Sequence, residues 1–174
     1  MIRLRAYAPG DRAAVKRVFF RAVREGAAGH YTAAQRAAWA PDPSVDPAQP
    51  DRLAGQFCLV SESEGQITGF MSLRDDGYLD MAFVLPEVMG KGHAAALYDA
   101  IEGEARRRGL TRLTCHASLL AKPFFQRRGW CVTKAEDYPV GPVSLRRFLM
   151  QLVIPSAAPA EPNPPEITVP RADG

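Results

Sequence analysis

The sequence predicts one α/β (α+β) domain with a mixed, mostly antiparallel sheet flanked by helices. Three strand patterns follow one another at 57–63, 66–74 and 78–85. The turns between them, Glu-Gly at 64–65 and Asp-Asp-Gly at 75–77, are so short that neighbouring strands must run antiparallel. A long amphipathic pattern, typical of a helix that covers one face of a sheet, comes next. These patterns favour a meander over the start of a parallel sheet.

Local patterns predict the other elements. Alternating apolar and basic residues at 2–7 indicate a half-buried strand, and Asp11 is expected to cap the helix that follows at 12–25. Thr32 can cap a short helix that ends at Trp39, before a proline-rich stretch. The remaining predicted elements are a helix at 90–108 that ends at Gly109, a strand at 110–117, a helix at 120–128, and strands at 130–138 and 143–153. The residues expected to bury the face of the 90–108 helix are Ala94, Leu97, Tyr98, Ile101 and Ala105.

Length and composition limit the class of protein. The chain has 174 residues, 47% of them hydrophobic and 24% charged, as expected for a single globular domain. We expect this domain at 1–154 and a flexible tail at 155–174, which is rich in Pro, Ala and Glu and lacks periodicity. A net charge of +3 gives no case for a nucleic-acid partner. No apolar run reaches the length of about 18 residues that would cross a membrane, and the N-terminus lacks a signal-peptide pattern.

The cysteines indicate a reducing compartment. Cys58, Cys115 and Cys131 are odd in number, far apart, and each placed in an apolar, strand-like run. A reduced cysteine in such a run behaves as a small hydrophobic residue. No Cys-x-x-Cys or Cys/His spacing suggests a metal site, so we expect no structural metal and a cytoplasmic protein.

The loop before the 90–108 helix has the character of an anion site. Gly90 and Gly92 let the backbone turn closely, and a helix start presents unpaired N–H groups and the positive end of the helix dipole. A pyrophosphate would suit such a site. A Walker loop is excluded because Gly92 is followed by His93 rather than by the Lys-Ser/Thr pair that the motif requires.

A dinucleotide fingerprint is the other phosphate motif that the loop matches. Gly90-x-Gly92-x-x-Ala95 has the GxGxxG/A spacing. That fingerprint requires a parallel βαβ unit and an acidic residue at the end of the next strand. Here the preceding strands form a meander, and the next strand ends in Cys115-His116-Ala117-Ser118. The context therefore disfavours a dinucleotide.

Two motifs together resemble the GNAT family of N-acetyltransferases. Val84-x-Pro86-x-x-x-Gly90-x-Gly92-x-Ala94 is similar to the pyrophosphate-binding motif of that family. Further along, Ser118-x-x-Ala121-x-x-Phe124-Phe125-x-x-x-Gly129-Trp130 resembles its second landmark, and the order of elements over about 1–153 also agrees. The segments 30–41 and 121–125 are similar to the YafP-like subgroup.

The resemblance implies acetyl-coenzyme A as cofactor. Acetyl would pass directly, in a ternary complex, to a primary amine of a small molecule or a protein. Backbone groups of Phe83 and Val84 would pair with the pantetheine arm in a gap between the meander and the strand near Cys115, while a backbone N–H polarises the acetyl oxygen. The residues that the resemblance assigns to the cofactor are Phe83, Val84, Met89, Gly90, Lys91, Gly92, His93, Ala94, Ser118, Ala121, Phe124 and Phe125.

The chain departs from the family pattern at three positions. Met89 replaces the usual Arg or Gln beside the phosphates, and Ser118 stands where many members carry Asn. Phe125 stands where many members carry a tyrosine that protonates the leaving sulfur, and a phenyl ring cannot donate a proton. These departures keep open an alternative function, a coenzyme A-binding regulatory or sensor module with little catalytic activity.

Three polar residues are candidates for catalysis, each with an ordinary structural alternative. Asp80 is a carboxylate within the third meander strand and could collect the proton of the amine or belong to a polar outward face of that strand. His116 could act near the acetyl group or be a satisfied strand histidine. Ser118 could contact the cofactor or cap the following helix.

The region between the first two helices is expected to form the wall of the acceptor pocket. His30, Tyr31 and Trp39 are the candidate substrate-binding residues there, although Trp39 could equally fill the core. Neither the acceptor nor the oligomeric state, a homodimer included, can be read from the sequence.

Overall fold

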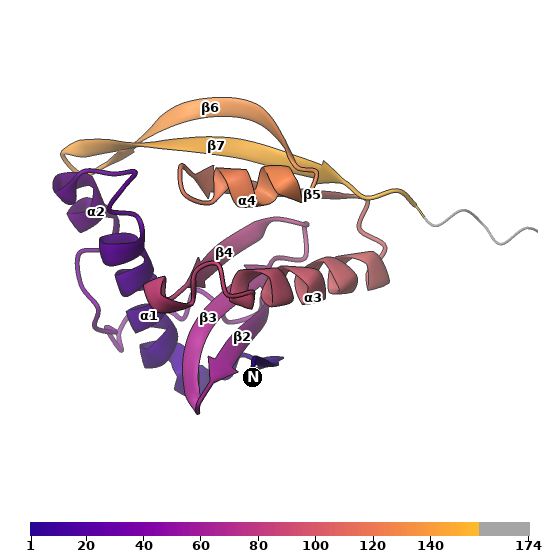
Figure 1. The fold of residues 1–174 in the computed structure, drawn as a ribbon, viewed down its shortest axis with the longest axis horizontal. Helices are drawn as coiled ribbons and strands as arrows, with labels where there is room; N and C mark the ends of the chain where they lie inside the picture. The colour runs from indigo at the N-terminus through magenta and orange to yellow at the C-terminus, as the bar shows by residue number, and fades with distance from the viewer. Residues whose placement is uncertain (157–174) are drawn as a thin grey trace, which may run out of the picture.

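Seven strands form two antiparallel sheets within residues 1–156, the part of the chain that the computed structural model describes (Figure 1). One sheet has the strand order β1-β2-β3-β4 and the other β5-β7-β6. The strands are β1 (Arg3–Ala6), β2 (Phe57–Ser63), β3 (Gln66–Leu73), β4 (Leu79–Val84), β5 (Arg112–Ser118), β6 (Cys131–Val140) and β7 (Val143–Val153). The predicted mixed, mostly antiparallel architecture is confirmed, although the sheet is split in two. Most of the tail predicted at 155–174 lies outside the described residues.

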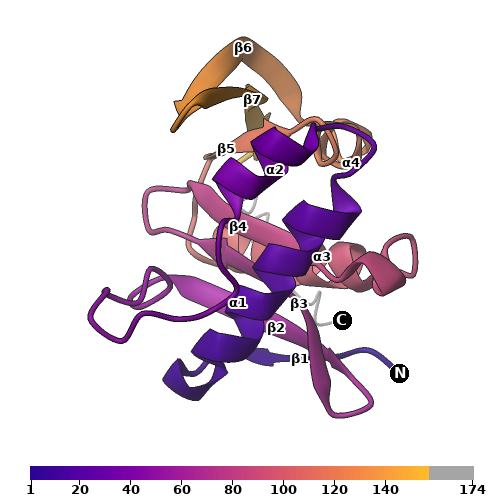
Figure 2. The same cartoon turned by 90° about the vertical axis from the view of Figure 1, so that its left-hand side faces the viewer.

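The helices connect and cover the sheets. They are α1 (Arg12–Arg21), α2 (Ala33–Trp39), α3 (His93–Arg107) and α4 (Lys122–Arg127), with 3₁₀ turns at Pro9–Asp11 and Pro86–Val88 and a π-helical turn at Ala22–Gly26. Figure 2 shows α1 on one side of the β1–β4 sheet and α3 on the other. Within the described residues, none of the helices is both long and apolar enough to cross a membrane.

The caps predicted for the first two helices differ in outcome. Thr32 begins α2 as expected, because its side chain accepts a hydrogen bond from the N–H of Gln35, and the Gln35 side-chain oxygen accepts one from the N–H of Thr32. The prediction that Asp11 caps α1 is wrong. Its carboxylate instead accepts from Ala8 N–H and pairs with Arg5 at 2.7 Å, which ties β1 to the turn before α1.

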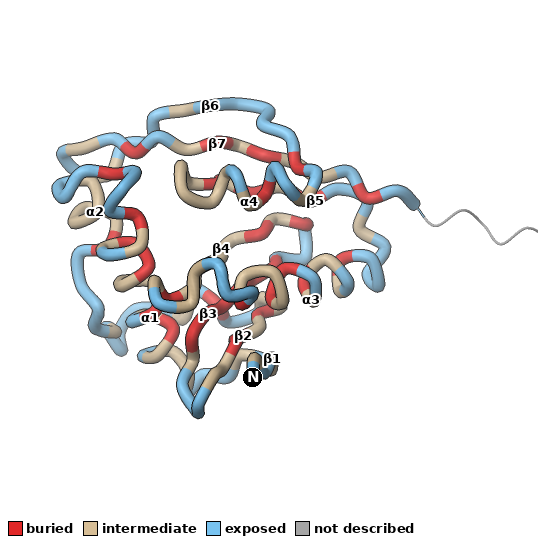
Figure 3. The backbone as a smooth tube through the Cα atoms, viewed as in Figure 1, coloured by how far each residue is buried: buried red, intermediate tan, exposed pale blue. Residues whose placement is uncertain are grey.

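The core lies on both faces of the β1–β4 sheet (Figure 3). On one face, α3 buries the side chains predicted for it, Leu97, Tyr98, Ile101 and Ala105, while Ala94 is only half-buried. On the other face, Val15 and Val18 of α1 pack against β2 and β3. Burial of these apolar surfaces holds the helices to the sheet.

Two of the three cysteines occupy this core. Cys58 and Cys115 are buried and free, and burial raises the pKa of each thiol to about 12. Cys131 is also free but exposed, on the edge strand β6. The expectation that all three fill apolar positions is therefore wrong for Cys131, because β6 turns most of its side chains to solvent.

The two sheets meet at one point. Tyr78 and Thr114 form an isolated parallel bridge, and Thr114 N–H donates to Gly77 O at 3.1 Å. β4 and β5 do not pair beyond this bridge in the described part of the chain. In β4, the register shifts between the pairs Met81–Ser72 and Leu79–Leu73, so Asp80 is the extra residue of a β-bulge. The bulge lies just where the strands part.

We predict that the meeting point tolerates no side chain at Gly77. Its φ is +84°, and a Cβ would lie 2.6 Å from Arg112 O. Gly65 is the matched control, with φ of +76° and open space around it. Gly65→Ala should lower the free energy of unfolding by about 1 kcal/mol through backbone strain, and Gly77→Ala by a further ~1–3 kcal/mol through the clash. Urea denaturation measures both, and equal losses would contradict the prediction.

Candidate functional site

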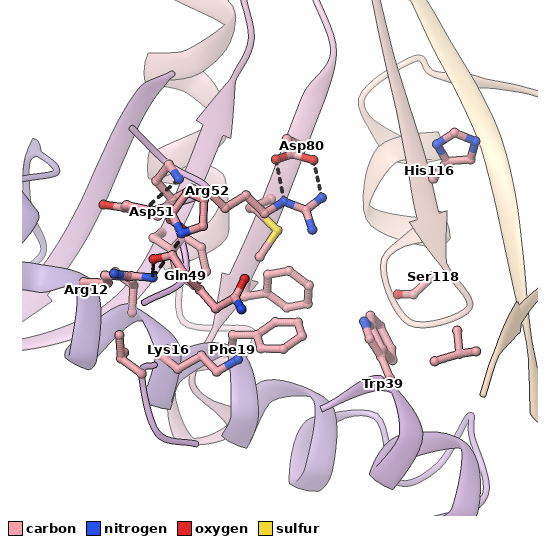
Figure 4. Close-up of a pocket in the computed structure, with 18 of the residues that line it drawn as sticks. Arg12, Lys16, Phe19, Trp39, Gln49, Asp51, Arg52, Asp80, His116 and Ser118 are labelled. Carbon is pink, nitrogen blue, oxygen red and sulfur yellow. Dashed lines mark hydrogen bonds and ion pairs between the residues drawn. The ribbon is translucent and has the colours of Figure 1, made fainter. Parts of the chain in front are cut away.

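A cleft of ≈ 630 Å³ lies where β4 and β5 separate (Figure 4). It is bounded by β4, β5, α1, α2, the segment 44–53 and the strands β6 and β7. One side is aromatic: the Phe19 ring lies edge-on to Phe83 at 4.9 Å and to Trp39 at 6.4 Å. The opposite sides carry charged and polar groups from β4, β5 and β7. The cleft thus has an apolar surface beside fixed charges.

Asp80 is turned into this cleft by the β-bulge, but it is already paired. Arg52 contacts both carboxylate oxygens, at 2.6 and 2.9 Å, and Gln56 donates to one of them at 2.8 Å. Burial raises the pKa of Asp80, but the hydrogen bonds and charge of Arg52, together with Gln56, outweigh it and hold the pKa below its ordinary value. A carboxylate stabilised in this way is a weak base, so the geometry favours a role in holding Arg52 over the predicted role of proton acceptor.

His116 faces Asp80 across the cleft from β5 (Figure 4). Its Nδ1 lies 2.7 Å from the Tyr78 hydroxyl, and its Nε2 lies 3.4 Å from Glu136 Oε1. Glu136 is in turn paired with Arg147 at 2.7 Å. Burial and the positive charge of Arg147 lower the pKa of His116 despite the opposing charge of Glu136. The imidazole is therefore neutral at neutral pH and able to accept a proton.

Ser118 and Tyr31 also line the cleft, but their hydroxyls have structural partners. Ser118 Oγ accepts from Ala121 N–H at 3.1 Å, just before α4, in agreement with the capping alternative. Tyr31 is 5% exposed; its hydroxyl donates to Arg146 O at 2.6 Å and accepts from Leu119 N–H at 2.9 Å. Tyr31 thereby joins the segment before α2 to β7 and to the end of β5. His30 is exposed and does not line the cleft.

The glycine loop leads from β4 into α3. Gly90 and Gly92 have φ of +74° and +90°, and a Cβ on Gly90 would meet nothing within 4 Å. Gly92 is the N-cap residue of α3, so the first amides of the helix have no carbonyl partner within the helix. Lys91 is exposed beside them. This open, cationic helix start fits a phosphate group.

Two side chains assigned to the cofactor from sequence point away from the helix start. His93 is 5% exposed, and its Nδ1 lies 2.8 Å from Thr68 Oγ1 in the sheet. The Met89 side chain packs on Gly26, where a Cβ would lie 2.4 Å from Met89 Cε. These two side chains hold the loop to the fold, and only the backbones of Met89 and His93 remain for a ligand.

The backbone of β4 offers two residues to the gap. Leu85 N–H donates to Thr68 O at 2.8 Å, and Phe83 lies opposite Phe70. Since hydrogen-bonded and non-hydrogen-bonded pairs alternate in an antiparallel ladder, Phe83 directs its backbone groups toward β3, whereas Ala82 and Val84 direct theirs toward β5. This alternation corrects the expected backbone pairing of Phe83. The Phe83 ring belongs instead to the aromatic side of the cleft.

The second landmark builds the far side of the gap. Phe125 is 2% exposed and its ring centroid lies 5.0 Å from that of Trp130. Phe124 is half-buried and lies edge-on to Tyr98 at 5.8 Å. Ala121 is half-buried at the N-cap of α4. No group of three or more His, Cys, Asp or Glu side chains in the described residues is placed to bind a metal ion.

Comparison with known proteins agrees with this arrangement. The family described as Acetyltransferase (GNAT) domain matches residues 28–142. The chain belongs to the GNAT family. The uncharacterized N-acetyltransferase YafP of Escherichia coli (strain K12) is 37% identical over 137 residues, which cover 78% of this chain and 85% of YafP. The predicted resemblance to the GNAT family and to YafP is confirmed.

Solved GNAT structures share the fold. A GCN5-related N-acetyltransferase from Rhodopseudomonas palustris has a TM-score of 0.79 and 31% identity, covering 87% of this chain and 95% of that one. The putative acetyltransferase YncA from Salmonella typhimurium, whose structure contains acetyl-CoA, has a TM-score of 0.62 and 24% identity, covering 92% and 99% of the two chains.

Sequence reasoning missed two residues that line this GNAT cleft, Tyr78 and Arg52, and also Glu136, which contacts the cleft residue His116. Tyr78 directly follows a tight turn, and its position in the sequence predicts only the start of a strand. Arg52 lies in the irregular, proline-rich stretch, where no periodicity predicts its direction. One signal was present: a carboxylate such as Asp80 inside an otherwise apolar strand requires a partner. The sequence does not say which of the 22 Lys and Arg residues supplies it.

We predict that His93 makes stability depend on pH. Burial, and to a lesser degree the positive charges of the N-terminus and Lys91, lower the pKa of His93. The stability that its neutral form contributes is complete above the ordinary histidine pKa of about 6.5 and is lost as the pH falls through the lowered value.

Thermal melts from about pH 7.5 to about pH 5.5 should therefore show a smaller loss in His93→Gln than in the unmodified chain. His116 contributes in the same direction, so part of the loss should persist. His30→Gln, which removes an exposed imidazole, is the control. Parallel curves for the unmodified chain and His93→Gln would refute the prediction.

Proposed function

We propose that this GNAT domain transfers acetyl from acetyl-coenzyme A to a primary amine of a small molecule or a protein, by direct attack in a ternary complex. The observation that carries the proposal is the gap between β4 and β5, which leads from the glycine loop to the aromatic cleft. The open helix start at one end would hold a phosphate group, and the cleft at the other would hold the second substrate. Membership of the GNAT family supports the same reaction.

Coenzyme A fits the groups that the structure leaves open. The amides of Gly90, Gly92 and Ala94 at the start of α3, with Lys91, would hold the pyrophosphate. The backbone groups of Ala82 and Val84 would hold the pantetheine arm. When bound, acetyl-coenzyme A supplies an activated acyl group. The residues of the chain would orient it and exclude water from the gap, with Phe124 and Phe125 packing beside the arm.

The acceptor amine would enter through the cleft, on the side of β4 and β5 opposite to the cofactor. Trp39, Phe19 and Phe83 would contact its apolar part, since their rings line the cleft. The Asp80–Arg52 pair would fix the charge at the cleft wall and keep Arg52 directed inward. His116 would lie beside the reacting amine. Trp39 would thus contact the substrate, Tyr31 would have a positioning role, and His30 would make no contact with it.

A coenzyme A-binding module without efficient catalysis is the second candidate. Phe125 supports it, because the ring at this position is buried and carries no proton donor. Isothermal titration with acetyl-CoA, together with thiol release over a broad panel of primary amines, separates the two candidates. Binding followed by amine-dependent thiol release supports transfer, whereas binding without release supports the module. Tighter binding of NAD than of acetyl-CoA would refute both.

We predict that the glycines of the loop act on cofactor affinity beyond their effect on folding. Gly90→Ala and Gly92→Ala should each raise the Kd for acetyl-CoA by about tenfold, because a Cβ at either position separates the backbone amides from the pyrophosphate. Gly109→Ala is the matched control: it has φ of +72° and open space, at the other end of the same helix. It should cost similar backbone strain and leave the Kd unchanged. Equal Kd values for all three variants would contradict the assignment.

A further inference from the structure

Tyr78 and His116 join the two sheets inside the cleft through a side-chain hydrogen bond. The Tyr78 hydroxyl lies 2.7 Å from Nδ1, and Glu136 Oε1 lies 3.4 Å from Nε2. A carboxylate can only accept, and a neutral imidazole carries its proton on one nitrogen. We therefore assign the proton to Nε2, facing Glu136, so that Nδ1 accepts from the Tyr78 hydroxyl.

We propose that Tyr78, backed by His116, carries the proton of the acceptor amine to the departing sulfur and so takes the role of the tyrosine that is absent at Phe125. This inference rests on the proposed acetyl transfer. It makes Tyr78 a catalytic residue at the cleft and His116 its proton acceptor.

The geometry of the gap places the reacting atoms near this pair. The arm of the cofactor would start at the glycine loop, which follows β4, and enter the gap between β4 and β5. On β4 it would lie beside Ala82 and Val84. The bridge between Tyr78 and Thr114 closes the gap at the other end. The thioester must therefore stop between Val84 and Tyr78, where the cleft opens. Tyr78 and His116 both line the cleft at that closed end.

The relay balances the protons of the reaction. The neutral amine nitrogen attacks the acyl carbon, so a C–N bond forms and the C–S bond breaks. The nitrogen gives one proton to the Tyr78 oxygen, and the Tyr78 proton passes to His116 Nδ1. The reverse movement, from His116 through Tyr78, protonates the thiolate. The proton that nitrogen loses is the one that sulfur gains, and both side chains end as they began.

Burial and the surrounding charges hold the His116 ring neutral at rest, so that it is ready to accept a proton. Glu136 attracts the protonated ring, while Arg147 and Lys134 repel it. Glu136 and Arg147 form an ion pair with each other, and Lys134 lies 3.3 Å from Glu136. On the Tyr78 side stand the Asp80–Arg52 pair and Arg74, whose guanidinium lies 5.2 Å from the Tyr78 ring centroid. Burial and the charge of Asp80 raise the pKa of Tyr78, so the hydroxyl keeps its proton until the reaction demands it.

The test removes the hydroxyl and the imidazole separately and together. Tyr78→Phe and His116→Gln should each lower kcat by roughly 100-fold, within the range for general acid–base catalysis, with an unchanged Kd for acetyl-CoA. Since the two groups act as one unit, the double variant should be no slower than the slower single variant. Tyr7→Phe is the control: its hydroxyl donates a hydrogen bond of the same 2.7 Å length to Asp51, but Tyr7 does not line the cleft.

The pH–rate profile gives a readout that a structural role would not move. With an amine that is neutral across the range, kcat should fall in the unmodified chain as the pH drops through the lowered pKa of His116, because protonated His116 cannot accept a proton. This limb should disappear in His116→Gln. Undiminished kcat in Tyr78→Phe, or an unaltered limb in His116→Gln, would overturn the relay while leaving acetyl transfer in place.

Nitrogen NMR of the imidazole tests the relay without turnover. The unmodified chain should show His116 protonated at Nε2 and free at Nδ1. Tyr78→Phe should raise the pKa of His116, since the lost hydrogen bond stabilised the neutral ring. A ring protonated at Nδ1 would overturn the relay alone. A chain that binds acetyl-CoA but releases no thiol with any amine would overturn the proposed function and the relay together.

Discussion

The separation of β4 from β5 after a single bridge is the constraint on which the rest of the site depends. A continuous sheet would satisfy the backbone groups of Ala82 and Val84 with a neighbouring strand, and no ligand could reach them. Here the bridge at Tyr78 and Thr114 holds the sheets together, and Gly77 permits the close approach by having no side chain. From that point the strands diverge, so unpaired backbone and a cleft arise from the same feature.

The groups around this gap are positioned by contacts that lie behind them. His93 reaches Thr68 in the sheet, Met89 packs on Gly26, and Arg21 pairs with Glu87 at 2.8 Å. These contacts hold both ends of the glycine loop while its amides stay open. The side chains of Met89 and His93 thus serve the scaffold. The loop presents backbone alone, together with Lys91.

The departures from the family pattern acquire a physical meaning in the structure. Phe125 belongs to an aromatic group with Tyr98 and Trp130, where it contributes packing rather than a proton. A hydroxyl does enter the cleft, but from Tyr78, the residue before β4, where it meets His116. A proton donor beside the reacting sulfur can therefore come from the opposite side of the gap. The β-bulge at Asp80 lies beside this tyrosine and turns a charged pair toward the same cleft.

The sequence by itself determined the elements that depend on residues close together in the chain. The hairpin turns, the Thr32–Gln35 capping box, the buried face of α3 and the glycine-rich helix start depend on residues a few positions apart, and the structure agrees with each. Asp11 shows the limit even of local reasoning, since Arg5 and Ala8 compete for its carboxylate. The direction of a side chain and its partner were decided only by tertiary structure. Tyr78 and His116 are 38 residues apart, and Arg52 and Asp80 are 28 apart on elements of different type. No periodicity encodes such contacts, because they arise where two sheets, formed by separate parts of the chain, come together and then part.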